Sequence, residues 1–254
     1  MTHSPRASII IPNYNGLNYM PQCLECVFTQ TYPNYEVIVV DDGSYDKSPD
    51  FVEAHYPSVR LIRRSQNQGF ARAVNHGIRA SEGRYVVVLN NDTQVSTDWL
   101  SHLVEATESG PAVGMCASKI LYLEDKNVLD SAGLTVDRAG IAWSLRNGEF
   151  DVEDFSSPCQ EVFGASAGAA LYRREMLDQI GLFDEDFGMY LEDADLAWRA
   201  QLAGWRALYT PLAVVFHAHS ATAKNDSPFK AYHLTRNRIW MIAKNYPSHV
   251  LRWW

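Results

Sequence analysis

The chain has 254 residues, of which 46% are hydrophobic and 20% are charged, a composition typical of a folded protein with one large core. Its formal net charge of −8 argues against a nucleic-acid partner, because neutralising phosphates requires clustered lysine and arginine. No apolar run approaches the roughly 20 residues of a membrane-spanning helix, and the N-terminus has no signal-peptide pattern, so we expect a cytoplasmic protein.

The first half of the chain alternates short β-branched runs with amphipathic segments of helical length. Continuous apolar strands separated by such helices indicate parallel strand–helix–strand units with both faces of the sheet covered. The predicted fold class is therefore α/β, with a doubly wound, mostly parallel sheet. The predicted strands are 7–12, 36–40, 59–63, 84–89 and 112–118, and the predicted helices lie near 18–29, 47–55, 69–80 and 97–109.

Past residue 120 the alternation weakens. Residues 128–150 have the Gly and Asn turns of an antiparallel ribbon, and residues 161–175 form a Gly- and Ala-rich strand and loop that enters a helix. We find no internal repeat and no low-complexity linker between the two halves. We therefore expect one continuous domain, in which 1–120 is the α/β half and 121–254 carries a small antiparallel annex that binds a partner.

Polar clusters follow four of the predicted strands, at 12–16, 41–46, 64–69 and 90–93. Ligands of open α/β sheets bind beyond the carboxyl ends of the strands, so four clusters along one edge indicate a binding site, whereas one alone would be a turn. The chain contains neither GxGxxG after its first strand nor a P-loop motif. If a nucleotide binds, a divalent cation held by a carboxylate such as Asp92 is the expected means of neutralising its phosphates.

A second candidate constellation is the acidic cluster Glu192, Asp193 and Asp195 at the start of a predicted helix. The helix dipole alone favours acidic residues in a first turn. The preceding DEDFGMYL, however, is an acidic, aromatic and glycine-containing stretch typical of the border of a cleft, where one carboxylate can act as a general base on a hydroxyl.

Two further clusters hold histidines and arginines. A strand delivers His217 and His219 to the same face, where they are either packed core residues or metal ligands. Arg236 and Arg238, predicted near the front of the last helix, are either solvated or bind a diphosphate. The final HVLRWW leaves a peripheral contact with the inner membrane face and ordinary chain-end packing as alternatives.

The sequence resembles a family 2 glycosyltransferase of the GT-A fold (the nucleotide-diphospho-sugar transferase fold), especially the bacterial rhamnosyltransferase-like members. The resemblance covers nearly the whole chain, in family order and at family-like spacing. It implies an inverting transferase that moves a sugar from a nucleotide diphosphate donor, with dTDP-rhamnose favoured and UDP-sugars next. The acceptor would be a saccharide or lipid-linked saccharide in cell-surface polysaccharide synthesis, and the cofactor Mn²⁺ or Mg²⁺. The motifs are SIIIPNYNG, VIVVDDGSYD, NQGFARAVNHGI, VVLNNDT, GASAGAALYRRE, GLFDEDFGMYLEDADLAWR and VVFHAHS.

The resemblance also implies residue roles, with the nucleotide-sugar in the half 1–120 and the acceptor and catalytic groups in 121–254. Asp193 would be the catalytic base, and Asp92 with His217 would bind the metal, although the choice between His217 and His219 stays open. The residues implied for the acceptor are Gly164, Ala165, Ser166 and Glu192. Those implied for the donor are Pro12, Asn13, Tyr14, Asp41, Asp42, Asn67, Arg72, Asn90, Asn91, Asp92, Arg236 and Arg238.

One departure from the family pattern is Asn90, which stands where the family has the first aspartate of Asp-x-Asp. This removes one negative charge, although an asparagine can still bond a ribose hydroxyl or a metal-bound water, so we expect a weaker but retained metal site. Donor binding through the arginines without a metal is one alternative. A non-catalytic sugar-nucleotide-binding scaffold is another, and the presence of both Asp193 and Asp92 argues against it.

Overall fold

The computed structural model describes residues 6–152, 159–218 and 227–251. A ten-stranded sheet dominates this part of the chain. A separate antiparallel ribbon consists of β8 (Leu134–Val136) and β9 (Ala142–Ser144). The strands of the sheet are β1 (Ala7–Asn13), β2 (Tyr35–Asp41), β3 (Arg60–Arg63), β4 (Tyr85–Leu89), β5 (Thr93–Val95), β6 (Val113–Tyr122), β7 (Leu129–Ser131), β10 (Gln160–Val162), β11 (Ala169–Arg173) and β12 (Arg206–His217).

The strand order is β10-β12-β6-β11-β4-β1-β2-β3, with β5 paired to β12 and β7 paired to β6. The first four strands of the chain, β1 to β4, pair in parallel, and so do β6 and β12. This confirms the predicted α/β class with its mostly parallel central sheet. Strand β11, from the second half of the chain, lies antiparallel between β4 and β6, so strands from both halves build one sheet.

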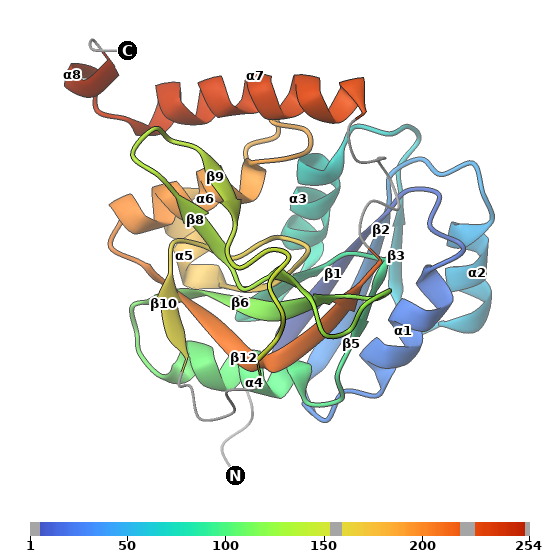
Figure 1. Cartoon of the computed structure of the whole chain (residues 1–254). Coiled ribbons are helices and arrows are strands. Elements are labelled where there is room, and N and C mark those ends of the chain that lie inside the picture. The colour runs from blue at the N-terminus through green and yellow to red at the C-terminus, as the bar shows by residue number, and fades with distance from the viewer. Residues whose placement is uncertain (1–5, 153–158, 219–226, 252–254) are drawn as a thin grey trace.

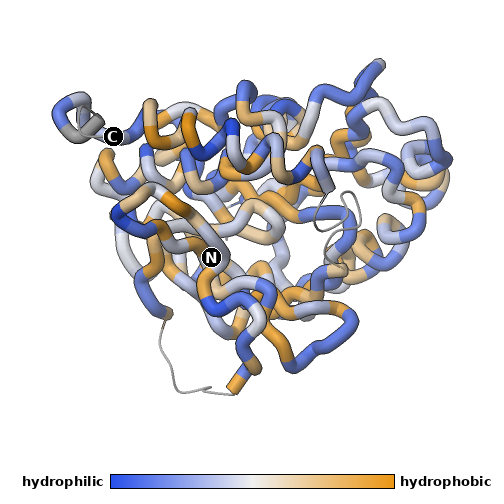
Figure 2. Tube along the Cα trace, turned by 45° about the horizontal axis from the view of Figure 1, so that its top comes forward, coloured by the Kyte–Doolittle hydropathy of each residue, from blue (hydrophilic) through white to orange (hydrophobic). Residues whose placement is uncertain are grey.

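Helices cover both faces of the sheet. Residues of α1, α2 and α4 share one hydrophobic cluster with one side of the strands, and residues of α3, α5 and α6 share a second cluster with the other side (Figure 1). Along these helices hydrophobic and hydrophilic residues alternate, as expected when one face packs on the sheet (Figure 2). The helices are α1 (Met20–Phe28), α2 (Ser48–His55), α3 (Phe70–Ala80), α4 (Trp99–Glu108), α5 (Arg174–Ile180), α6 (Glu192–Leu202), α7 (Pro228–Asn245) and α8 (Ser248–Leu251).

Strand β4 explains why an apolar run leads directly into polar residues. All five of its residues are buried, with Val87 and Leu89 in one hydrophobic cluster and Val86 and Val88 in the other. A central strand with both faces covered needs apolar side chains at every position. The polar residues that follow are the first to leave the sheet, at its ligand-binding edge.

Two elements differ from their predicted bounds. Strand β12 begins at Arg206, whereas the apolar run predicted a strand only from residue 213, because Pro211 interrupts the pattern and the pairing with β6 shifts register between Thr210 and Val214. Helix α7 begins at Pro228, after Ser227, whose hydroxyl accepts a hydrogen bond from the Lys230 N–H at 3.2 Å. Arg236 and Arg238 therefore lie in the middle of the last long helix rather than at its front.

None of the described helices has both the length and the apolarity that crossing a bilayer requires.

Candidate active site

A cleft of about 790 Å³ opens at the carboxyl ends of β1, β2 and β4 and is lined by residues from both halves of the chain. Six of the predicted site residues do not line it, namely Asp41, Arg72, Gly164, Ala165, Arg236 and Arg238. The predicted residues that do line it are Pro12, Asn13, Tyr14, Asp42, Asn67, Asn90, Asn91, Asp92, Ser166, Glu192, Asp193 and His217.

A ladder of amide and carboxylate groups connects the ends of β1, β2 and β4. The Asn91 Nδ2 donates to the Asn13 Oδ1 at 2.8 Å, and the Asn13 Nδ2 donates to the buried Asp41 Oδ1 at 2.8 Å. Gly16 is required beside this ladder, because a Cβ there would lie 2.0 Å from the Asn91 Nδ2. Asp41 therefore supports Asn13 from behind instead of facing the cleft.

Asp42 lines the cleft, but both of its carboxylate oxygens already have partners within the protein. Its Oδ1 forms an ion pair with the Arg64 Nη1 at 2.7 Å, and its Oδ2 accepts the backbone N–H groups of Gln68 and Gly69. Both charged side chains are nearly inaccessible to solvent. This pair fixes the loop between β3 and α3, which carries Asn67 into the cleft.

Another part of the cleft wall is formed where β5 pairs with β12. In this register Thr93 lies opposite His217, so Asp92 and His217 become neighbours although they are far apart in the sequence. The His217 Nε2 lies 3.2 Å from the Asp92 Oδ1, and its Nδ1 lies 2.7 Å from the Asp130 Oδ2. His219 lies outside the described residues, so the choice between the two histidines is open on structural grounds.

The imidazole of His217 is held between two carboxylates. Burial disfavours its charged form, but the hydrogen bonds with Asp130 and Asp92 outweigh this effect and raise the pKa of His217 to about 10. Among the described residues, no three His, Cys, Asp or Glu side chains converge as a metal cage. Asp92 and His217 could supply two ligands to a cation that completes its coordination with phosphate oxygens and water. Asp130 contacts the other ring nitrogen of His217, which is the position from which a carboxylate can orient a histidine ligand.

The start of α6 also lines the cleft. The backbone immediately before this helix is strained. Tyr190 and Leu191 have φ values of 71° and 65°, a left-handed conformation that is uncommon for bulky residues and is often found at functional sites. The buried Asn237 of α7 lies against this turn. Its Nδ2 lies within 3.0 Å of three carbonyl oxygens, those of Phe187, Met189 and Tyr190.

Asp193 and Glu192 are adjacent carboxylates in the first turn of α6. The two oxygens of Asp193 accept the N–H groups of Ala167 at 3.1 Å and Ala194 at 2.8 Å. Burial raises the pKa of Asp193, although these hydrogen bonds act in the opposite direction. Burial and the neighbouring Asp193 raise the pKa of Glu192 well above its usual value, and the Glu192 Oε2 is buried without a hydrogen-bond partner. This pair therefore holds protons more tightly than two solvated carboxyl groups would.

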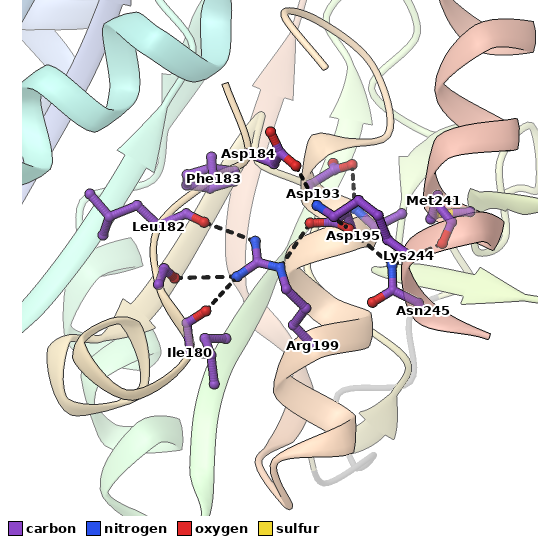
Figure 3. A network of polar contacts seen from close by, with 12 residues as sticks. Ile180, Leu182, Phe183, Asp184, Asp193, Asp195, Arg199, Met241, Lys244 and Asn245 are labelled. Carbon is purple, nitrogen blue, oxygen red and sulfur yellow. Dashed lines mark hydrogen bonds and ion pairs between the residues drawn. The ribbon is translucent and has the colours of Figure 1, made fainter. Parts of the chain in front are cut away.

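A polar network anchors α6 behind these carboxylates (Figure 3). Asp195, whose side chain is fully buried, pairs with the Arg199 Nε at 2.8 Å and the Lys244 Nζ at 3.1 Å, and it accepts a hydrogen bond from the Asn245 Nδ2 at 2.9 Å. Arg199 also donates to the carbonyl oxygens at the end of α5 and just beyond it. The network joins α6 to both α5 and α7 and so fixes the direction in which Asp193 points.

The cleft has two acidic corners, one with Asp92 and His217 and the other with Glu192 and Asp193. The loop between Ser166 and β11 links them. The Ala167 N–H binds the Asp193 carboxylate at 3.1 Å, and the next residue, Gly168, accepts the Asn90 N–H at 2.8 Å through its carbonyl. Gly164 packs closely on α6, where a Cβ would lie 2.4 Å from the Ala197 Cβ. Of the three loop residues predicted for the acceptor, only Ser166 lines the cleft.

The predicted arginines bind protein groups outside the cleft. Arg72 lies 3.7 Å from Glu185, and the Arg236 Nη2 donates to the carbonyl oxygens of Asp186 and Phe187. The Arg238 Nε is buried without a partner. Among the described lining residues, Lys230 carries the one lysine or arginine side chain that faces the cleft.

The sequence did not single out Asp130, Trp143 or Lys230, all of which line the cleft. Asp130 had a detectable signal, because it is a charged residue within the otherwise apolar and small-residue stretch VLDSAG of the predicted ribbon. Trp143 and Lys230 had none, because an exposed tryptophan on a ribbon and a lysine in a first helical turn are both ordinary.

Comparisons with known proteins agree on the family. The sequence profile of glycosyl transferase family 2 matches residues 8–181. An uncharacterized protein of Sinorhizobium fredii is 29% identical over 253 residues, which are 95% of this chain but only 28% of that protein. N-acetylglucosaminyl-diphospho-decaprenol L-rhamnosyltransferase of Mycobacterium tuberculosis is 28% identical over 252 residues, 89% of this chain and 80% of that enzyme.

Solved structures show the same fold. The mannosyltransferase PcManGT of Pyrobaculum calidifontis, in complex with GDP-Man and Mn²⁺, has a TM-score of 0.67 at 23% identity, over 96% of this chain and 64% of that one. TarS of S. aureus, in complex with UDP-GlcNAc, has a TM-score of 0.67 at 20% identity, over 96% and 68%. The fold is GT-A, and because the family profile covers most of the chain, the protein belongs to glycosyltransferase family 2 and is similar to its rhamnosyltransferases.

Proposed function

We propose that the protein is an inverting glycosyltransferase that moves a sugar from a nucleotide diphosphate donor to a hydroxyl of a saccharide or lipid-linked saccharide in cell-surface polysaccharide synthesis. The observation that carries this proposal is that Asp193 and the Asp92–His217 pair line one cleft and are joined through Ala167 and Gly168. Inversion requires a base on the face of the sugar opposite the departing diphosphate. Asp193 would be this base, and the Asp92–His217 pair would lie on the side of the departing diphosphate.

The favoured donor is dTDP-rhamnose, because the mycobacterial rhamnosyltransferase aligns with 89% of this chain. A UDP-sugar is the next candidate, since TarS was crystallised with UDP-GlcNAc. In either case the nucleotide would lie along β1 and the loops after β2 and β3, against Pro12, Asn13, Tyr14 and Asn67. Asp42 would contribute through its rigid pairing with Arg64.

Asp92 and His217 would hold the divalent cation, Mn²⁺ or Mg²⁺, with Asp130 orienting the imidazole. When bound, such a cation stabilises negative charge on the diphosphate. Asn90, beside Asp92 in the cleft, would bind a ribose hydroxyl or a metal-bound water through its amide. Lys230 is the described cationic side chain placed to assist the diphosphate, a role first predicted for the arginines.

Asp193 would take the proton from the attacking acceptor hydroxyl. Its two backbone hydrogen bonds orient the carboxylate, and its raised pKa brings its basicity closer to neutral pH, where a general base is most effective. Ser166 and Glu192 would contact the acceptor, and the partly exposed indole of Trp143 offers a surface on which a sugar ring can stack. The donor and a lipid-linked acceptor would meet at the cytoplasmic face of the membrane.

A panel of sugar nucleotides, incubated with and without Mn²⁺ or Mg²⁺, tests this proposal through the rate of donor hydrolysis. We expect hydrolysis of one donor, stimulated by metal, and the largest rate for dTDP-rhamnose. A donor that is bound but not hydrolysed in any condition would favour the alternative, a non-catalytic sugar-nucleotide-binding scaffold. Equal rates with chelator and with metal would contradict the assignment of Asp92 and His217, and would support donor binding without a metal.

A further inference from the structure

Helix α7 has its apolar residues on the outside. Phe229, Tyr232, Ile239 and Trp240 are exposed, and their spacing places them on one face of the helix. We call these four residues, together with Arg236 between them, the outer face of α7. Figure 1 shows α7 lying across one end of the molecule, and within this face Trp240 also packs edge-on against Phe187.

The opposite side of α7 contacts the protein through polar and apolar groups, since Met241 belongs to a small hydrophobic cluster with Phe187 and Ala194. Asn237 and Asn245 are buried there with Met241, and their amides bind the turn before α6 and the Asp195 carboxylate. A surface helix of a water-soluble protein normally keeps polar residues on its outward side, whereas α7 exposes large apolar side chains there. The outer face is therefore a contiguous apolar surface that needs an explanation, unlike scattered exposed leucines.

The chemistry of the outer face fits the interfacial region of a membrane. Tyrosine and tryptophan have an apolar ring with a polar edge, which suits the boundary between lipid headgroups and acyl chains. The Arg236 guanidinium lies 4.4 Å from the Trp240 ring centroid and 5.7 Å from that of Tyr232. The guanidinium covers this apolar surface, and although its Nη2 also donates to the carbonyl oxygens of Asp186 and Phe187, these neutral partners leave its positive charge in place.

The charge of α7 is opposite to that of the chain. Residues 228–245 contain four basic and no acidic side chains, within a chain whose formal net charge is −8. Lys244 is compensated by Asp184 and Asp195. Neither Arg236 nor Arg238 contacts a carboxylate of the described residues, so no described acidic group neutralises their charges. A negatively charged surface would be attracted to this helix and repelled by the rest of the molecule.

The first turns of α7 also form part of the cleft, through Lys230 and Leu234. We propose that the outer face of α7 docks on an anionic membrane surface and thereby holds the mouth of the cleft at the lipid headgroups. The docking itself follows from the residues of α7, whereas the delivery of a lipid-linked acceptor to the cleft rests on the proposed function. A helix lying in the interface, with its apolar side chains inserted and its basic residues near the headgroups, has this geometry.

Co-sedimentation with vesicles tests the docking independently of catalysis. The test variant is Tyr232→Ser/Ile239→Ser, which changes two side chains that are 62% and 63% exposed and do not line the cleft. The matched control is Phe150→Ser/Leu202→Ser, which removes an aromatic and an aliphatic side chain that are 71% and 68% exposed elsewhere. Near-ultraviolet circular dichroism and donor hydrolysis verify that both variants are folded and have an intact cleft.

We expect the wild-type chain to bind vesicles of phosphatidylcholine and phosphatidylglycerol in equal parts, and to bind pure phosphatidylcholine more weakly. The test variant should lose affinity by roughly tenfold or more, and added salt should weaken wild-type binding. The control variant should bind as the wild type does. Transfer to a vesicle-borne acceptor should fall in the test variant while donor hydrolysis does not.

Three results would overturn the proposal. The first is wild-type affinity of the test variant for the mixed vesicles. The second is loss of binding on Trp253→Ser/Trp254→Ser together with full binding of the α7 variant, which would assign the contact to the chain end. The third is a concentration-dependent dimer in sedimentation velocity that the α7 variant abolishes, because a second copy would then cover the face. Absence of donor hydrolysis in all variants, with vesicle binding as expected, would refute the proposed function and leave the docking intact.

Discussion

The cleft has two acidic corners that are built on opposite electrostatic principles. At the first, His217 lies between Asp92 and Asp130, with contacts of 3.2 and 2.7 Å, so the negative charge there is compensated by a positive group. At the second, Glu192 and Asp193 are adjacent, and no described cation contacts either of them. Burial raises the pKa of both carboxyl groups.

This difference separates two chemical tasks that use the same residue type. Two carboxylates that contact one imidazole suit a site that binds a cation, which displaces the proton of the histidine as it binds. Carboxyl groups that are buried without a counter-ion hold protons more tightly and suit proton transfer near neutral pH. The environment of each aspartate, rather than its identity, therefore distinguishes Asp92 as a candidate ligand from Asp193 as a candidate base.

The largest expected effect is at the proton-transfer corner. Asp193→Asn should lower turnover by about 10²- to 10⁴-fold, which corresponds to roughly 3 to 5.5 kcal/mol, because a positioned general base is lost. Donor affinity, measured by calorimetry, should be nearly unchanged. Asp186→Asn, an exposed aspartate in the loop before α6, is the control and should keep its activity. Wild-type turnover in Asp193→Asn would remove Asp193 as the base.

A neighbouring aspartate should affect stability instead of chemistry. Asp195→Ala removes the carboxylate that Arg199, Lys244 and Asn245 share, and it should lower the free energy of unfolding by about 3 kcal/mol. We place it at the low end for a buried pair because Lys244 is partly solvated. Urea unfolding measures the loss, with the exposed Asp178→Ala of α5 as the control. Equal unfolding midpoints for Asp195→Ala and the control would show that the network does not anchor α6.

The cation-binding corner is tested through Asp130, which would act on the metal only through His217. Asp130→Asn should weaken Mn²⁺ binding by about 10- to 100-fold while turnover at saturating metal stays close to wild type, because the imidazole loses the carboxylate that orients it. Calorimetric titration with Mn²⁺ and the metal dependence of donor hydrolysis give two independent readouts. Asp125→Asn, exposed in the preceding turn, is the matched control. Unchanged Mn²⁺ affinity would show that Asp130 does not orient His217 for metal binding.

Local patterns predicted much of this arrangement. The apolar runs of β1, β2 and β4 gave the parallel sheet, and the polar clusters after them gave the edge where the cleft opens, because both follow from residues close in the sequence. The position of β11 between β4 and β6 was not visible, since strand order depends on contacts between distant segments.

The same limit applies to the site. The proximity of His217 to Asp92 requires the register of β5 on β12, which no short motif encodes. Arg236, predicted near the front of the last helix, was expected either to be solvated or to bind a diphosphate. Its guanidinium instead donates to backbone carbonyls at the turn before α6, a partner that becomes apparent only after α7 is placed. A sequence shows which groups are available but not which of them are already occupied.

The smallest expected effect concerns Glu192 and the pH dependence of stability. Its pKa in the folded state is raised well above the usual value of 4.5, first by burial and then by Asp193. The stability from holding this proton is fully present below about pH 4.5 and is lost as pH rises through the folded-state pKa, because in that window the folded chain must keep a proton that the unfolded chain releases. Glu192→Gln is neutral at every pH and should remove this slope, which for one proton is at most about 1.4 kcal/mol per pH unit.

Urea unfolding at several pH values between about 5 and about 8 measures the difference between Glu192→Gln and the wild type. We expect the variant to gain on the wild type steadily as the pH rises, while Glu161→Gln, a solvent-exposed glutamate of β10, gains nothing. Parallel stability profiles for Glu192→Gln and the wild type would mean that Glu192 ionises normally in the folded protein. The two acidic corners would then still differ in their partners, and burial of Asp193 would be the one remaining cause of a raised pKa at the second corner.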